Sequence, residues 1–254
     1  MTGYFDSHCH VHDPRTPGGT DAAVQAAHDA GVDTMVTVGC DRETSLAAIE
    51  VAARHSGVWA TVGLHPHDAK LGLDTITDLF DQPKVVAVGE AGLDYYYDHS
   101  PRDVQREVFA AQIQIAHERR LPLVIHTRDA WDDTFDVLAT EGAPEQTVFH
   151  CFTGGPDEAR RALDLGAFVS FSGIVSFKHA PEVQAAARLV PFERMLIETD
   201  APYLAPHPHR GKPNQPAWVT ATAQFVADLR DVPVAHVAGA TTANGHAAFP
   251  SIDR

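Results

Sequence analysis

Short apolar segments recur along the whole chain, with room for a helix between neighbours. Eight of them have strand length, at 4–11, 33–38, 58–64, 84–88, 121–125, 147–149, 167–171 and 194–197. Segments with helical spacing of apolar residues lie between several of them, at 22–30, 46–55, 103–119, 156–165 and 180–190. Eightfold alternation of strand and helix is typical of a (β/α)8 barrel. The sequence therefore predicts an α/β TIM barrel that forms a single domain over residues 1–254, with disorder only in the tail at 249–254.

The composition is that of an ordinary globular protein, with 44% hydrophobic and 21% charged residues. No segment reaches the roughly 18 to 20 apolar residues needed to span a bilayer, and the N-terminus lacks a secretory pattern. The three cysteines have irregular spacing, which indicates reduced thiols. We therefore expect a cytoplasmic protein without membrane contact, and nothing in the sequence indicates an obligate protein partner.

The charge balance is strongly acidic, with 19 Lys and Arg against 34 Asp and Glu and a formal net charge of -15. Such a balance disfavours broad electrostatic attraction to a nucleic-acid backbone. If the substrate is a polyanion, a few local cations must hold it.

The first apolar segment contains polar residues at every second position, in the stretch YFDSHCHVHD at 4–13. Because strand side chains alternate between faces, Asp6, His8 and His10 are expected to share one face, which His12 would extend if the strand continues. The simplest interpretation is a strand that exposes this face to solvent. The alternative is a metal site, since imidazole is a common ligand of divalent metals.

Further polar residues stand at the carboxyl ends of later segments: His65, Glu90, His126, His150 and Asp200. Taken singly, each has an ordinary interpretation as a solvated turn carboxylate, a buried histidine bonded to backbone, or a cap. In a barrel, however, these ends converge on the face that carries the active site. Four histidines and two carboxylates, namely His8, His10, His126, His150, Glu90 and Asp200, would suit two divalent ions bridged by a carboxylate. Such ligands fit Mg, Mn, Zn or Fe.

Six ordered motifs extend this pattern over almost the whole chain: DSHCH at 6–10, GLHPH at 63–67, GEAGLD at 89–94, HTRDA at 126–130, HCFTG at 150–154 and ETDAPYL at 198–204. Together with RGKPNQP at 210–216, they resemble the TatD family of metal-dependent deoxyribonucleases. The resemblance implies a TIM-barrel hydrolase of the amidohydrolase-like superfamily that cleaves phosphodiester bonds. Its expected substrate is DNA, as single strands or 3' ends, with 3'-to-5' exonuclease action.

The resemblance also implies roles for individual residues. It places one metal ion on His8, His10 and Asp200, a second on His126 and His150, and a bridging carboxylate at Glu90. It further suggests that His65 and Arg128 contact substrate phosphate.

Chemical arguments add to these roles. Asp200 is the expected catalytic carboxylate, which accepts or orients the proton of the attacking water, with Glu90 as its catalytic partner. Arg210 is a further candidate phosphate contact, and Asp6, Asp94 and Glu198 are expected to support the ligands from behind. Tyrosines 95–97 could stack on a terminal base or simply pack over a loop.

Two other functions remain open at this point. A hydrolase of a small phosphoester, amide or ester substrate could use the same scaffold, because fold does not fix function. Amidohydrolase relatives often bridge their metals with a modified lysine, but none of the four lysines (Lys70, Lys84, Lys178, Lys212) lies at a matching strand end. A non-catalytic binding protein would have little use for a complete ligand set.

Overall fold

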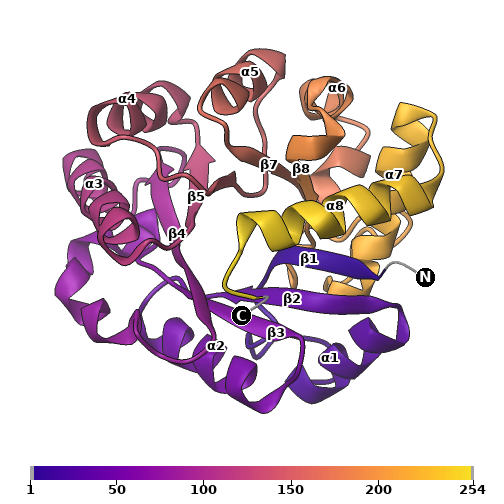
Figure 1. Ribbon diagram of the computed structural model, residues 1–254, viewed down its shortest axis with the longest axis horizontal. Helices are drawn as coiled ribbons and strands as arrows, with labels where there is room; N and C mark the ends of the chain where they lie inside the picture. The colour runs from indigo at the N-terminus through magenta and orange to yellow at the C-terminus, as the bar shows by residue number, and fades with distance from the viewer. Residues whose placement is uncertain (1–2, 253–254) are drawn as a thin grey trace.

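The computed structural model describes residues 3–252 and contains one sheet of eight parallel strands in sequential order (Figure 1). The strands are β1 (Tyr4–Cys9), β2 (Val32–Val38), β3 (Val58–Val62), β4 (Val85–Asp94), β5 (Leu123–Arg128), β6 (Thr147–Phe149), β7 (Phe168–Phe171) and β8 (Met195–Ile197). The sheet closes between its first and last strands, where Asp200 N donates to His8 O at 2.9 Å and His10 N donates to Ala201 O at 2.7 Å. The predicted single-domain (β/α)8 barrel is confirmed.

Helices surround the sheet in Figure 1. The α-helices are α1 (Thr20–Asp29), α2 (Arg42–Arg54), α3 (Arg102–Arg119), α4 (Trp131–Glu141), α5 (Pro156–Asp164), α6 (Pro181–Leu189), α7 (Val219–Arg230) and α8 (Val234–Ala248). Short 3-10 helices are η1 (Pro66–Leu71), η2 (Leu73–Thr75), η3 (Thr77–Leu79), η4 (Gly173–Ser176), η5 (Phe192–Arg194) and η6 (Pro216–Trp218). None of the helices in the described range 3–252 combines the length and apolarity needed to cross a membrane.

The apolar residues of the strands form two separate layers. Side chains such as Val36, Val124 and Leu196 fill the barrel interior. Those of neighbouring positions, such as Met35 and Ile125, pack outward against the helices. This division follows from the alternation of side chains along a strand.

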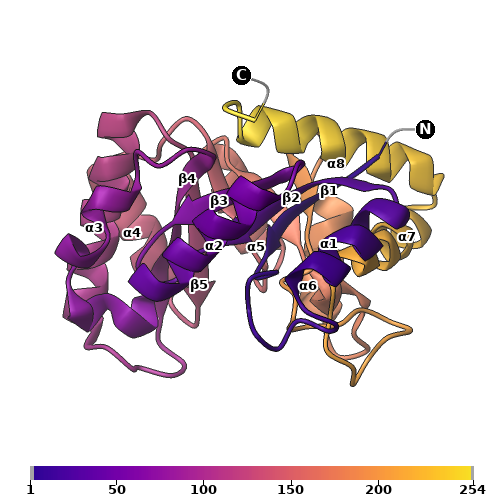
Figure 2. The same ribbon diagram turned by 90° about the horizontal axis from the view of Figure 1, so that it is seen from below.

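Helix α8 covers the end of the barrel opposite the long loops that follow β1 and β8 (Figure 2). Its Gly245 lies so close to Phe5 that a Cβ atom would come within 2.5 Å of the ring. Phe249 is fully buried and stacks on Phe5 with ring centroids 6.1 Å apart. The segment beginning at Phe249 was expected to be disordered, whereas this residue is part of the core; residues 253–254 lie outside the described residues.

Two strands depart from the simple alternation that the sequence suggests. In β1, Asp6 pairs with outward-packing Met35, and Cys9 also packs outward, with a register irregularity between Asp6 and Cys9. Such an irregularity, like a β-bulge, inserts an extra residue into the strand. Asp6 therefore does not share a face with His8 and His10, contrary to expectation.

Strand β4 continues to Asp94, so Glu90 lies within the strand instead of at its end. Val88 packs in the outer layer, and the register shifts between Val88 and Ala91. Glu90 can therefore face the barrel axis although it has the same parity as Val88. Gly92 permits this close approach to β5, because its φ is +139° and a Cβ there would lie 2.0 Å from His126 O.

Candidate metal centre

Glu90 lies at the centre of a cluster of histidines at the carboxyl end of the barrel. Its Oε1 is 2.8 Å from His150 Nε2 and 3.0 Å from His126 Nδ1, and its Oε2 is 3.4 Å from His8 Nε2. These partners come from β1, β5 and the residue after β6, so the barrel gathers them from distant parts of the sequence. Glu90 itself is only 3% exposed.

Asp200 forms the other side of the cluster. Its Oδ1 is 3.4 Å from His10 Nε2 and 3.8 Å from His8 Nε2. His8 thus lies between the two carboxylates of Glu90 and Asp200. The structure brings together all six residues that were expected as ligands: His8, His10, Glu90, His126, His150 and Asp200.

Three of the histidines are oriented by an acceptor behind the ring. His10 Nδ1 lies 2.9 Å from Val38 O, His126 Nε2 lies 3.1 Å from Asp94 Oδ2, and His150 Nδ1 lies 3.3 Å from Glu198 Oε1. A carbonyl or carboxylate can only accept, so the proton of each neutral ring is on that nitrogen. The second nitrogen of each ring, which carries a lone pair when the ring is neutral, faces Glu90 or Asp200.

This arrangement fits a bound cation. Lone pairs of histidine and carboxylate oxygens face each other at 2.8–3.4 Å, which is repulsive unless a positive charge lies between them. The buried atoms His8 Nε2 and His150 Nε2 also lack a hydrogen-bond partner. Metal-binding histidines commonly donate their other N–H to a carbonyl or carboxylate in this way.

The electrostatics of the cluster point in the same direction. Burial lowers the pKa of His150, but the carboxylates of Glu90 and Glu198 outweigh it and raise the pKa well above its ordinary value. Burial by itself would raise the pKa of Glu90, but the neighbouring histidines, above all His150, hold it well below its usual range. The site therefore stabilises positive charge next to an ionised Glu90.

Asp94 holds the side of the cluster near β5. Its Oδ2 accepts from His126 Nε2 and from His67 Nε2, each at 3.1 Å, and its Oδ1 accepts from the backbone N–H groups of Tyr96 and Tyr97 at 3.0 Å. Burial would raise the pKa of Asp94, but these bonds, first that of His126, keep it well below its ordinary value. His67 was not expected here; its proximity to His65 in GLHPH was the only available signal.

His65 contacts the cluster with a donor instead of a lone pair. Its Nδ1 accepts from His67 N at 3.1 Å, which places the ring proton on Nε2, 3.5 Å from Glu90 Oε1. Burial, the largest influence, lowers the pKa of His65 well below its ordinary value, so the ring is neutral. His65 thus offers an N–H to an oxygen in the site.

Asp6 and Glu198 lie behind the ligands. Asp6 accepts from Thr199 N at 2.9 Å and from Thr199 Oγ1 at 2.6 Å, and burial raises its pKa to about 8. Glu198 accepts from Cys151 N at 2.7 Å as well as from His150. Both carboxylates fix the segment that leads to Asp200.

Cys40 is a residue that the sequence pattern did not indicate. Its Sγ lies 3.5 Å from Glu90 Oε2, and it groups with His10 and Glu90 closely enough to hold a metal ion. Cys9 and Cys151, by contrast, lie outside every such group found among residues 3–252. Cys40 follows the end of β2 by two residues, a position that could have marked it.

The two arginines expected at the substrate each pack over an aromatic ring. The guanidinium of Arg128 packs over the ring of Tyr96, 3.9 Å from its centroid. Tyr96 and Tyr97 are about half exposed, at 57% and 50%. Arg210 packs in a similar way over Phe177, at 3.6 Å.

Comparison with known proteins agrees with this geometry. The family model described as "TatD related DNase" matches residues 5–250. The chain is 39% identical over 250 residues to the uncharacterized metal-dependent hydrolase YabD of Bacillus subtilis, covering 96% of this chain and 98% of that protein. It is 41% identical over 239 residues to the uncharacterized metal-dependent hydrolase TatD of Mycobacterium tuberculosis, covering 89% of each.

A solved structure is also similar over its full length. The TatD homologue YJJV of Escherichia coli K12 superposes with a TM-score of 0.91 at 27% identity, covering 97% of this chain and 98% of that one. Sequence and fold thus agree over almost the whole chain. The chain therefore belongs to the TatD family of metal-dependent hydrolases.

Proposed function

We propose that the protein is a two-metal phosphodiesterase that removes nucleotides from the 3' end of DNA. The observation that carries this proposal is the cluster around Glu90, in which six ligand groups direct lone pairs at one another. His8, His10 and Asp200 would hold one ion, His126 and His150 the other, and Glu90 both. Divalent ions there would lower the pKa of water and neutralise charge on a phosphate oxygen.

The protein's own groups would then complete the chemistry. The closest contacts of Asp200 with His8 and His10 are both made by its Oδ1, so its other oxygen can accept a proton from the attacking water. The Nε2–H of His65 can donate to a phosphate oxygen. Arg128, held over Tyr96, can do the same from the edge of the site.

The family description supports DNA as the substrate, and the exposed rings of Tyr96 and Tyr97 offer surfaces on which a terminal base can stack. The decisive experiment uses single-stranded DNA labelled at its 5' end, with metal-stripped protein to which Mg, Mn or Zn is returned singly. Stepwise shortening from the 3' end that requires metal supports the proposal. Internal cuts or shortening from the 5' end would overturn the proposed polarity.

A second candidate is hydrolysis of a small phosphoester. The net charge of -15 favours it, because a strongly acidic surface repels a long polyanion. Activity on bis(p-nitrophenyl) phosphate with no shortening of DNA under any metal would select this candidate. The ligand cluster would then keep the same role with a smaller substrate.

A further inference from the structure

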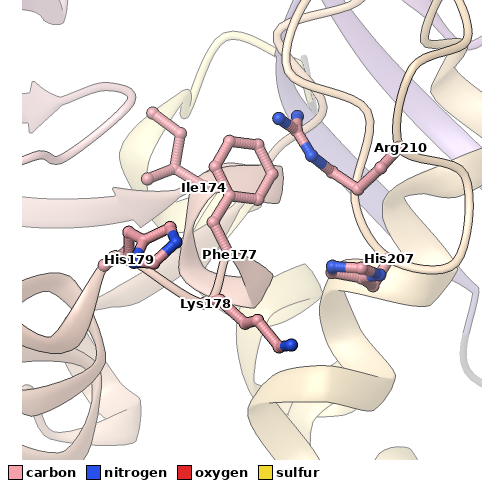
Figure 3. Close-up of a pocket in the computed structure, with 7 residues that line it drawn as sticks. Ile174, Phe177, Lys178, His179, His207 and Arg210 are labelled. Atoms are coloured by element: carbon pink, nitrogen blue, oxygen red, sulfur yellow. The ribbon is translucent and has the colours of Figure 1, made fainter.

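A pocket of about 320 Å³ opens where the segment after β7 meets the loop after β8. Lys178 and His179 line it from the first segment, and His207 and Arg210 line it from the second. Figure 3 shows these four side chains around one space, together with Phe177. None of the four is among the groups that could hold a metal ion in the described chain.

The two walls of the pocket are joined by close contacts. His207 N donates to Ser176 Oγ at 2.9 Å. Gly173 lies so near the opposite loop that a Cβ atom there would be 2.0 Å from Leu204 O. The same loop begins just after Asp200, so the pocket shares the active end of the barrel with the ligand cluster.

The pocket gathers positive charge without a carboxylate. Some arginines of the chain, such as Arg42, Arg102 and Arg160, form ion pairs with aspartates. Within residues 3–252, neither Lys178 nor Arg210 has an ion pair with a carboxylate, and no carboxylate lines the pocket. Two unneutralised cations beside two imidazoles, in a chain of net charge -15, favour an anionic ligand.

Arg210 is also positioned for such a ligand. Its guanidinium packs over the Phe177 ring, with 3.6 Å from Cζ to the centroid, and this contact favours one position of the side chain. The edge of a stacked guanidinium remains available for donation, and its fork of N–H groups matches phosphate oxygens. One nitrogen is 3.5 Å from Ala205 O, which leaves the other donors for a ligand.

The position of the pocket relates it to the proposed substrate. Arg128 and Tyr96 stand at the ends of β5 and β4, whereas the pocket stands at the ends of β7 and β8, across the barrel mouth. A DNA strand that crosses the mouth of the barrel would pass over the ligand cluster on its way from Arg128 and Tyr96 to the pocket. We propose that the pocket binds a backbone phosphate of single-stranded DNA next to the one that is cleaved. This inference rests on the proposed nuclease function.

The test compares substrates with and without a second phosphate. The double variant Lys178→Gln, His207→Gln is assayed on decathymidylate and on thymidylyl-thymidine, which contains only the scissile phosphodiester. Its kcat/KM on the decamer should fall about fivefold, since exposed charge contacts contribute up to about 1 kcal/mol. The dependence of log(kcat/KM) on log salt should weaken by up to about 0.7 for one lost phosphate contact.

Activity on thymidylyl-thymidine should be unchanged, because that substrate has no phosphate to place in the pocket. The matched control is Arg188→Gln, an exposed charge at the far end of α6. It removes one positive charge outside the pocket and should behave as wild type. The proposed phosphate site would be wrong if the double variant cleaved the decamer at the wild-type rate, or if the control lowered that rate equally. Either result would leave the nuclease function intact.

Binding is measured separately, so that the pocket is tested even if no DNA is cleaved. Anisotropy of dye-labelled decathymidylate is recorded with Asp200→Asn protein loaded with metal, with and without the pocket substitutions. About fivefold weaker binding in the substituted protein supports the pocket. Equal binding by the two proteins would contradict the phosphate site. Whether the protein is a nuclease is then decided separately, by cleavage with the wild-type protein.

Discussion

Nε2 of His150 lies 2.8 Å from Oε1 of Glu90 and has no hydrogen-bond partner, although both side chains are buried. Two acceptors at this distance need a positive charge between them, either a ring proton, which the raised pKa of His150 favours, or a metal ion, because a bare lone pair facing a carboxylate is repulsive. Glu90 has the same relationship with His126 at 3.0 Å. This single carboxylate therefore links the two halves of the proposed metal centre.

The substitution Glu90→Gln should weaken the binding of both ions together, by more than about a hundredfold, because changes that only support a ligand already cost 10- to 100-fold. Metal content per chain after gel filtration is the measurement. The exposed Glu145→Gln serves as the control. Retention of two ions per chain by the Glu90 variant would contradict a bridging role.

Asp200→Asn should lower kcat by about 10²- to 10⁴-fold, since an amide cannot accept the proton of the attacking water. The fold should persist, because the backbone bond from Asp200 N to His8 O does not involve the side chain. Circular dichroism and single-turnover kinetics on labelled DNA measure the two effects. An unchanged rate would remove Asp200 from the chemistry.

Asp94→Asn should weaken metal affinity by about 10- to 100-fold, because a neutral amide lacks the charge that holds His126 and His67, and its NH2 group cannot accept from the backbone N–H groups of Tyr96 and Tyr97. Excess metal should restore most of kcat, which distinguishes a positioning residue from a catalytic one. Titration of activity against free metal shows this directly. A defect in kcat that persists at saturating metal would contradict this role.

Removal of metal should lower the Tm as well as abolish activity, because the facing histidines and carboxylates lose the charge that holds them together. An ion present at about 100 times its Kd stabilises a fold by about 2.7 kcal/mol, or roughly 5–10 °C in Tm at this chain length. Differential scanning calorimetry with and without chelator measures the shift. The Glu90→Gln protein should show little response to chelator, and a full response there would argue for stabilisation elsewhere.

Phe249→Ala should destabilise the fold by about 3–5 kcal/mol, as expected for a buried phenylalanine that stacks on Phe5. The ligand cluster lies at the opposite end of the barrel, so metal content and kcat should remain unchanged. Urea denaturation gives the first value and steady-state assays the second. Wild-type stability would mean that the end of the chain contributes little to the core.

The sequence by itself determined the barrel. Its eight apolar segments correspond to the eight strands, because each buried strand requires a short run of apolar residues that can be recognised locally. The parity of side chains also held on β5, β6 and β8: His126, His150 and Asp200 lie an even number of residues after the interior residues Val124, Val148 and Leu196. These strands have regular register, so counting residues gives the correct face.

Only the tertiary structure decided the orientation of the other residues. Parity failed for Asp6 and Glu90, because β1 and β4 contain register irregularities that depend on pairing with neighbouring strands. The ring tautomers of the histidines, the approach of Cys40 to Glu90, and the pairing of His67 with Asp94 are likewise long-range contacts. The sequence shows which residue types could bind metal. Their ligand atoms come to face one another only after the barrel has closed.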